Sequence, residues 1–183
     1  MSCATARSCG HVAHFQAPEA SRRKFLAQVV LGGGAALLTS LPARAAGHVD
    51  ALLLTCMDYR LENEIVAWMD GRQMRDRYDH VVLAGASLGA LTDQRPEWGD
   101  TFWQHLDVAI QLHQVRKVIV LDHRDCGAYR VFLGPDAVKT PEAELAVHTR
   151  QLHGLKALVA QKHPELGVEL NLMALDGSVL AIA

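Results

Sequence analysis

The segment "HVDALLLTCMDYRL", residues 48–61, joins a largely apolar run directly to three reactive side chains. Residues 48–55 lack the regular polar alternation of a half-exposed strand, which is typical of a strand buried on both faces of a sheet. Cys56, Asp58 and Arg60 follow at alternate positions. Because alternate residues of an extended chain point to the same side, we expect these three side chains to share one face.

Strand and helix patterns alternate along the rest of the chain. Further strands are predicted at residues 80–86, 117–122, 167–175 and 178–183. Helices are predicted at residues 61–78, 100–115 and 140–163. Gly71 offers the first helix an earlier end, whereas Asp100 and Thr140 are good N-cap residues for the second and third. Asp176 and Gly177 form a hairpin turn signal between the last two strands.

This alternation predicts an α/β fold with a mainly parallel β-sheet. Helices would flank both faces of the sheet, and the final hairpin would add an antiparallel edge strand. In such sheets, functional groups gather beyond the C-terminal ends of the strands. Cys56 follows the first predicted strand, and His123 and Cys126 follow the third. We therefore expect these residues to meet at one edge of the sheet.

The N-terminal residues carry the pattern of a twin-arginine export signal. "SRRKFL" at 21–26 precedes a weakly apolar run, and the small-residue tripeptide "ARA" at 43–45 follows it. The apolar run contains three glycines and is shorter than the ~20 residues of a spanning helix. We expect residues 1–45 to engage the export machinery and be cleaved. Residues 46–183 would then form one periplasmic domain.

Composition and cysteine count narrow the function further. The chain has 183 residues and a formal net charge of −2, which argues against a nucleic-acid partner. Cys3 and Cys9 would leave with the signal. Two thiols and the imidazole of His123 are a zinc ligand set with an open fourth position. A disulfide between Cys56 and Cys126 is the alternative in an oxidising compartment.

Two motifs resemble those of a known family. "CMDYR" at 56–60 and "HRDCG" at 123–127 are similar to the CxDxR and HxxCG zinc motifs of the β-class carbonic anhydrases. The similarity extends to "HLDVAIQLHQVRKVIVLDH" at 105–123 and to "LNLMALDGSVLAI" at 170–182. It covers nearly the whole chain from about Ala51.

The resemblance implies a site and an activity. Cys56, His123 and Cys126 would hold one Zn²⁺, and Arg60 would turn the Asp58 carboxylate away from the metal. Asp58 would then orient a zinc-activated water toward carbon dioxide, which gives bicarbonate. In some family members the equivalent carboxylate instead ligates zinc in an inactive state. The resemblance also implies a homodimer or a higher homo-oligomer.

The chain departs from the family pattern around the expected substrate pocket, which Tyr59, Ala84, Gly85 and Gly127 would line. A bulky phenol stands at Tyr59 where a small residue is common, and the sequence before Gly85 lacks the usual asparagine. Asp122 replaces the usual glycine before the zinc histidine and is expected near the metal or beside His123. Two alternatives therefore stay open: a catalytically weak zinc-binding protein of this fold, and a hydrolase of carbonyl sulfide or carbon disulfide.

Overall fold

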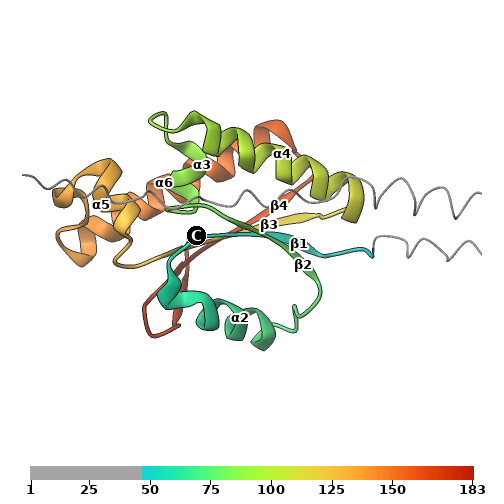
Figure 1. Cartoon of the computed structure of the whole chain (residues 1–183), viewed down its shortest axis with the longest axis horizontal. Helices are drawn as coiled ribbons and strands as arrows, with labels where there is room; N and C mark the ends of the chain where they lie inside the picture. The colour runs from blue at the N-terminus through green and yellow to red at the C-terminus, as the bar shows by residue number, and fades with distance from the viewer. Residues whose placement is uncertain (1–46) are drawn as a thin grey trace, which may run out of the picture. The chain divides into compact units, whose positions relative to one another are not determined.

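The computed structural model describes residues 47–183, so the predicted export signal lies outside the described residues. Its centre is a five-stranded sheet in the order β2-β1-β3-β4-β5 (Figure 1). The strands are β1 (Ala51–Thr55), β2 (Tyr78–Val82), β3 (Lys117–His123), β4 (Gly167–Met173) and β5 (Val179–Ala181). The first four are parallel, and β5 pairs antiparallel with β4 at the edge. The predicted α/β sheet with an antiparallel edge strand is thereby confirmed.

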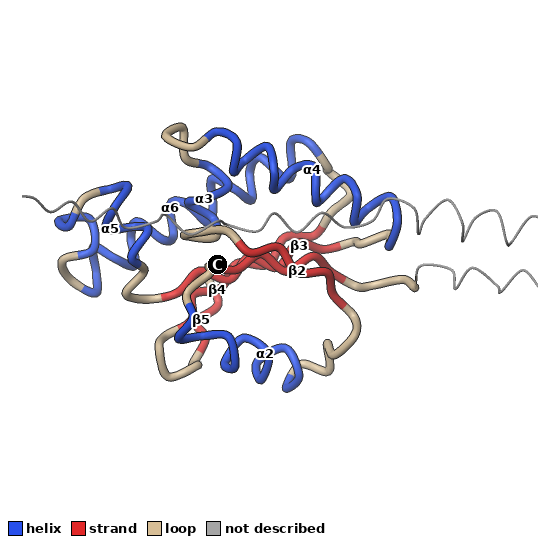
Figure 2. The backbone as a smooth tube through the Cα atoms, in the orientation of Figure 1, coloured by secondary structure: helices blue, strands red, loops and turns tan. Residues whose placement is uncertain are grey.

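Helices cover both faces of the sheet (Figure 2). One face packs against α2 (Glu62–Gly71), and the other packs against α4 (Pro96–His113) and α6 (Pro141–Lys162). The remaining elements are short: α3 (Ser87–Leu91), α5 (Gly127–Leu133) and the 3₁₀ turns η1 (Tyr59–Leu61) and η2 (Pro135–Val138). Within residues 47–183, no helix combines the length and apolar character needed to cross a membrane.

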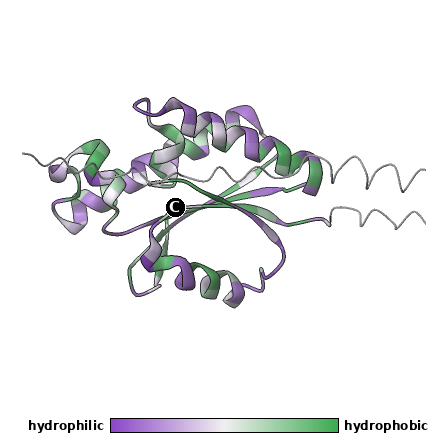
Figure 3. Cartoon of the chain, viewed as in Figure 1, coloured by the Kyte–Doolittle hydropathy of each residue, from purple (hydrophilic) through white to green (hydrophobic). Residues whose placement is uncertain are grey.

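The apolar run of β1 supplies both layers of the core. Leu52 and Leu54 point into the cluster formed with α4 and α6. Leu53 points the other way, toward Ile65 and Met69 of α2. Figure 3 shows the hydrophobic colour along the central strands, with polar and apolar residues mixed on the helices. Burial on both faces explains why the run shows no alternation.

Several element boundaries differ from the prediction. The first helix ends at Gly71, the earlier of the two ends considered. The second strand lies at Tyr78–Val82 rather than at 80–86, because the chain turns out of the sheet through positive φ values at Gly85 and Ala86. That turn leads into α3, which the sequence did not predict.

Two helix starts show which cap signals hold. The helix α4 begins at Pro96 rather than at Asp100, which matches the preference of proline for the first turn. Thr140 does cap α6 as predicted, since its Oγ1 accepts a hydrogen bond from the Ala143 N–H at 3.2 Å. The other short helix, α5, lies in a segment where the sequence predicts neither a helix nor a strand.

Candidate metal centre

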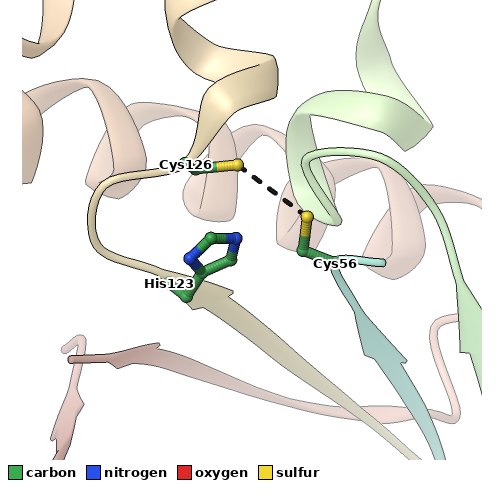
Figure 4. Close-up of side chains that lie close together, drawn as sticks. All are labelled: Cys56, His123 and Cys126. Atoms are coloured by element: carbon green, nitrogen blue, oxygen red, sulfur yellow. Dashed lines mark hydrogen bonds between the residues drawn. The ribbon is translucent and has the colours of Figure 1, made fainter. Parts of the chain in front are cut away.

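Three elements bring two sulfurs and an imidazole together at the C-terminal edge of the sheet. Cys56 directly follows β1, and His123 is the last residue of β3, the neighbouring parallel strand. Cys126 stands at the N-cap of α5. One donor atom from each residue lies within 4.8 Å of the others (Figure 4). The expected meeting of Cys56, His123 and Cys126 is therefore seen in the geometry.

The sulfur spacing matches a shared tetrahedral metal better than a disulfide. The two Sγ atoms lie 3.9 Å apart, and both cysteines are free. Two sulfurs each about 2.3 Å from a tetrahedral zinc would be about 3.8 Å apart. A disulfide needs a spacing of about 2.05 Å. The donor set and its spacing thus fit zinc, and the alternative disulfide is not formed.

His123 presents one ring nitrogen to the two sulfurs. Its Nδ1 atom is 2.8 Å from the Arg124 carbonyl oxygen and donates a hydrogen bond to it. Its Nε2 atom is buried and has no hydrogen-bond partner among the described residues. A buried polar atom without a partner calls for an explanation. A metal ligated by Nε2, with Nδ1 anchored on a carbonyl, is the arrangement usual for ligating histidines.

The cysteine pair is prepared to lose a proton. The hydrogen bond from the Cys126 thiol lowers the pKa of Cys56 to about 4, although burial acts in the opposite direction. The same hydrogen bond raises the pKa of Cys126. The Gly85 N–H also donates to the Cys56 sulfur at 3.3 Å. The Cys56 thiolate accepts a hydrogen bond from the proton that remains on Cys126. A bound metal would take the place of that proton.

Asp58 and Arg60 do not extend the strand, which corrects one expectation from the sequence. The strand β1 ends at Thr55, and Asp58 caps the 3₁₀ turn that contains Arg60. The Asp58 Oδ1 atom accepts a hydrogen bond from the Arg60 backbone N–H at 3.1 Å. The two side chains therefore meet through a tight turn rather than through alternation along one extended face.

The guanidinium of Arg60 grips Asp58 with both branches of its fork. Nε donates to Oδ1 at 2.9 Å, and one terminal nitrogen donates to Oδ2 at 2.7 Å. These hydrogen bonds lower the pKa of Asp58 to about 2. The carboxylate is 15% exposed and remains charged at neutral pH. It is therefore a hydrogen-bond acceptor beside the candidate metal position.

A largely apolar cavity of about 400 Å³ opens beside Cys56 and Asp58. Three of the four predicted pocket residues line it: Tyr59, Ala84 and Gly127. The fourth, Gly85, is not a lining residue, and its N–H contacts the Cys56 sulfur instead. Met57, Ala128, Val131 and Phe132 complete the lining, and the sequence did not predict them there. The cavity suits a small apolar molecule.

Asp122 does not contact the metal ligand that follows it. Its buried carboxylate accepts hydrogen bonds from Ser87 Oγ at 2.7 Å, the Tyr129 hydroxyl at 2.6 Å and His148 Nδ1 at 2.9 Å. These donors come from α3, α5 and α6, so one carboxylate ties three helices to the end of β3. The expected contact with His123 is not observed. The sequence did not predict that Ser87, Tyr129 and His148 donate hydrogen bonds to this carboxylate.

Comparison with known proteins agrees with the motifs and the fold. A family model described as "Putative carbonic anhydrase" matches residues 47–164. The chain belongs to this family. An uncharacterized protein of Rickettsia conorii is 35% identical over 136 residues, which cover 74% of this chain and 73% of the relative. One from Rickettsia bellii is 33% identical over 136 residues, or 74% of this chain and 83% of the relative.

Solved structures show that the fold of this family member is also that of β-carbonic anhydrases. The β-carbonic anhydrase CafD of Aspergillus fumigatus superposes with a TM-score of 0.51 at 14% identity. The match covers 80% of this chain and 96% of that one. At this identity the likeness extends to the fold alone, so the chemistry must be argued from the site.

Proposed function

We propose that this protein is a zinc enzyme that reversibly hydrates carbon dioxide to bicarbonate. The observation that carries the proposal is the convergence of the two sulfurs with the unpartnered Nε2 atom of His123. The Asp58 Oδ2 atom lies 3.8 Å from that nitrogen. Membership of the carbonic anhydrase family supports the same activity.

Cys56, His123 and Cys126 would hold the metal and leave a fourth position open. When bound in such a site, zinc supplies a Lewis acid that lowers the pKa of a water toward about 7. The Gly85 N–H keeps the Cys56 sulfur in place, and the Arg124 carbonyl keeps the His123 ring in place. The chain thus fixes two of the three ligands through backbone groups, which do not change rotamer.

Asp58 orients the attacking oxygen. Because both of its oxygens are held by Arg60, the carboxylate stays turned toward the guanidinium in this structure and does not belong to the ligand cluster. An anionic Asp58 accepts the hydrogen bond of the attacking oxygen and directs its lone pair at carbon dioxide. The apolar walls of the cavity, including Val131 and Phe132, hold that substrate and exclude water.

Stopped-flow hydration of carbon dioxide tests the proposal on zinc-loaded protein with one metal per chain. We expect a rate that rises between about pH 7 and pH 9 as the activated water ionises, and that falls on metal removal and recovers on zinc addition. Carbonyl sulfide and carbon disulfide are assayed in parallel, because the apolar cavity also fits these molecules. Zinc-loaded protein that does not hydrate carbon dioxide would show the proposal to be wrong: turnover of a sulfur compound alone would make it that hydrolase, and turnover of none of the three a zinc-binding protein.

We also propose a homodimer or a larger homo-oligomer. Four exposed apolar residues support it, each between 47% and 82% exposed: Met57, Tyr59, Val82 and Val131. Three of them line the cavity, and Val82 lies on β2, an outer strand of the sheet. A second copy would cover these side chains. Light scattering should report at least a dimer that Val131→Lys weakens, and a monomer at micromolar concentration would contradict this.

The export route is a separate proposal. The residues "SRRKFL" and "ARA" support a twin-arginine signal cleaved after Ala45, with the mature protein in the periplasm. N-terminal sequencing of the periplasmic form, with an Arg22→Lys and Arg23→Lys double variant as comparison, tests it. We expect cleavage near Ala45 and retention of the double variant in the cytoplasm. Export of the double variant at the wild-type rate would refute the route.

A further inference from the structure

Arg60 binds a second acidic residue in addition to Asp58. Its other terminal nitrogen donates to Asp125 Oδ2 at 2.8 Å. The nitrogen that holds Asp58 Oδ2 also donates to the Asp125 carbonyl oxygen at 3.0 Å. The guanidinium is 32% exposed, and it bridges the turn after β1 to the loop after β3. Asp58 and Asp125 therefore share one planar cation.

Asp125 lies between two candidate ligands in the sequence. Its side chain binds Arg60, and its backbone is held by the helix α6. It sits in the loop between His123 and Cys126, in the left-handed region at φ +54°. Its backbone N–H donates to Glu144 Oε1 at 2.5 Å. Glu144 is a buried residue of α6, and its second oxygen accepts from Arg124 at 3.1 Å. The long helix thus anchors the loop from which Asp125 reaches Arg60.

We propose that Asp125 is a positioning residue that fixes the plane of the Arg60 guanidinium and, through it, the direction of the Asp58 carboxylate. The inference rests on the proposed function, because the direction of Asp58 matters only if Asp58 serves the reaction. It adds to the pair Asp58 and Arg60 a third residue that belongs to the ligand loop. The ligands and the orienting carboxylate are then held in register by one set of hydrogen bonds.

The geometry of arginine explains why a second partner is needed. A guanidinium is planar and presents its donors in a fixed fork. The other contact of Asp58, from the Arg60 backbone N–H, lies within the same short 3₁₀ turn, so without Asp125 the pair and its turn could shift together relative to the ligand loop. Two hydrogen bonds to Asp125, along another edge of the guanidinium, tie that unit to the ligand loop. Small misplacements of catalytic groups lower rates steeply.

Asp125→Gly removes the carboxylate without straining the backbone, since glycine accepts a positive φ. We expect kcat to fall on the order of tenfold with KM and zinc content unchanged. Asp125→Asn, which keeps an acceptor oxygen, should lie between that variant and the wild type. Asp136→Gly is the matched control, because Asp136 is exposed and pairs only loosely with Lys139 at 3.9 Å. The control should keep wild-type kinetics.

A double-mutant cycle separates positioning from a general structural role. In an Arg60→Ala background, Asp125→Gly should change kcat by less than about twofold, because its route to Asp58 is already cut. Losses that multiply in the double variant, or a wild-type kcat in Asp125→Gly, would overturn the inference. Should Asp125→Gly fail to fold, the same cycle is run with Asp125→Asn.

A second measurement does not depend on turnover. In ¹H–¹⁵N spectra, a guanidinium held on both sides shows separate signals for its two terminal nitrogens, because rotation about the Nε–Cζ bond is slow. We expect separate Arg60 signals in the wild type, assigned by their loss in Arg60→Lys, and faster exchange between them in Asp125→Gly, which keeps only the bonds to Asp58 and to the backbone carbonyl of residue 125. An exchange rate in Asp125→Gly equal to that of the wild type would refute the inference even in an active enzyme. If the wild-type protein does not hydrate carbon dioxide, the proposed function is wrong. The spectra alone then decide whether Asp125 holds the Arg60 guanidinium.

Discussion

The Nε2 atom of His123 lies 3.8 Å from the Oδ2 atom of Asp58, so the candidate ligand and the orienting carboxylate face one another. Arg60 holds both oxygens of that carboxylate, which keeps the pKa of Asp58 at about 2. An oxygen between the metal position and Asp58 would meet an acceptor that never carries a proton at neutral pH. The acceptor is thus ready before substrate arrives.

Asp58→Asn should nearly abolish carbon dioxide hydration and leave zinc bound. The amide keeps the size of the carboxylate but loses its charge, and its NH₂ group cannot accept a hydrogen bond. We expect a loss of kcat of about 10²-fold, a typical effect of removing a positioned acceptor. Stopped-flow rates and metal analysis of the same sample measure both quantities.

The control for this change is Asp93→Asn, which makes the same substitution at an exposed position outside the cavity. It should keep the wild-type rate. Two findings would count against the assigned role of Asp58: an Asp58→Asn enzyme within threefold of wild type, or loss of rate only in proportion to loss of zinc.

Metal removal should expose both thiols of residues 47–183 and lower stability. Cys56 and Cys126 are free, and the metal would occupy both sulfurs. A ligand present at about 1,000 times its Kd adds about 4 kcal/mol to the free energy of unfolding. We therefore expect a clear drop in Tm after chelation, together with the appearance of two thiols that react with a disulfide reagent. Equal thiol reactivity with and without zinc would contradict the ligand assignment.

The sheet was predictable because its signals are local. Unbroken apolar runs predict β1 and β3, and Asp176 with Gly177 predicts the last turn. Each of these signals lies within a few consecutive residues. The short helices α3 and α5 have no such signal, since they contain only 5 and 7 residues. Their starts depend on the positive φ of Gly85 and on tertiary contacts with Asp122.

The candidate ligands were also predictable, because parallel strands bring their C-terminal ends to one edge. The supporting residues were not. Glu144 reaches Asp125 across 19 residues, and His148 reaches Asp122 across 26. One signal was present in the sequence. Glu144 and His148 lie one turn apart, on the same side of α6 as its buried apolar residues. A buried polar side chain requires a partner, but only the fold shows which one.

Gly85→Ala should destabilise the protein and weaken metal binding together. At φ +80° an alanine is strained, and its Cβ would lie 3.1 Å from the Cβ of Ala128. Relief of that contact moves the N–H that donates to Cys56 Sγ. We expect a loss of about 2 kcal/mol in the free energy of unfolding, measured in urea, and a higher zinc Kd, measured by chelator competition.

Gly134→Ala provides the matched comparison for this change. Gly134 has a similar φ of +86°, but no atom lies within 4 Å of its added Cβ. It should show the backbone strain alone, with the wild-type affinity for zinc. If both variants bound zinc equally well, the contact between Gly85 and the Cys56 sulfur would have no role in holding the metal.

Stability should fall in acid partly through Glu169. The Arg72 guanidinium binds this carboxylate at 2.7 and 2.8 Å and lowers its pKa. A carboxyl whose pKa is lowered by folding stabilises the protein above its unfolded value of about 4.3. That contribution is lost as the pH falls through the folded pKa. The ion pair should therefore contribute about 0.5–1 kcal/mol at pH 7 and little in acid.

Urea unfolding of Arg72→Gln across this pH range measures the contribution. The difference from wild type should shrink as the pH falls below about 4.3. It should not vanish, because Arg72 also stacks on the Trp68 ring at 4.4 Å, and that contact does not titrate. Arg116→Gln, at an exposed position, is the control. A difference that stays constant with pH would assign the whole effect to the stacking.

Asp122→Asn should lower the free energy of unfolding more than any other single change at a residue that contacts no candidate ligand side chain. The Asp122 carboxylate is 1% exposed and accepts from Ser87, Tyr129 and His148, while burial raises the pKa of Tyr129 and keeps its hydroxyl a donor. An amide would turn an NH₂ group toward donors that need an acceptor. We expect a loss of about 2–4 kcal/mol in the free energy of unfolding.

A second Asp–His pair in the same chain supplies the control for Asp122→Asn. Asp79 accepts from His113 Nδ1 at 2.7 Å, much as Asp122 accepts from His148 at 2.9 Å, but the first pair is about 30% exposed. Asp79→Asn should therefore cost at most about 1 kcal/mol. Tyr129→Phe should cost less in the Asp122→Asn background than in wild type, because its hydroxyl no longer has a charged acceptor. Equal losses for Asp79→Asn and Asp122→Asn would mean that the buried carboxylate does not hold the three helices to β3.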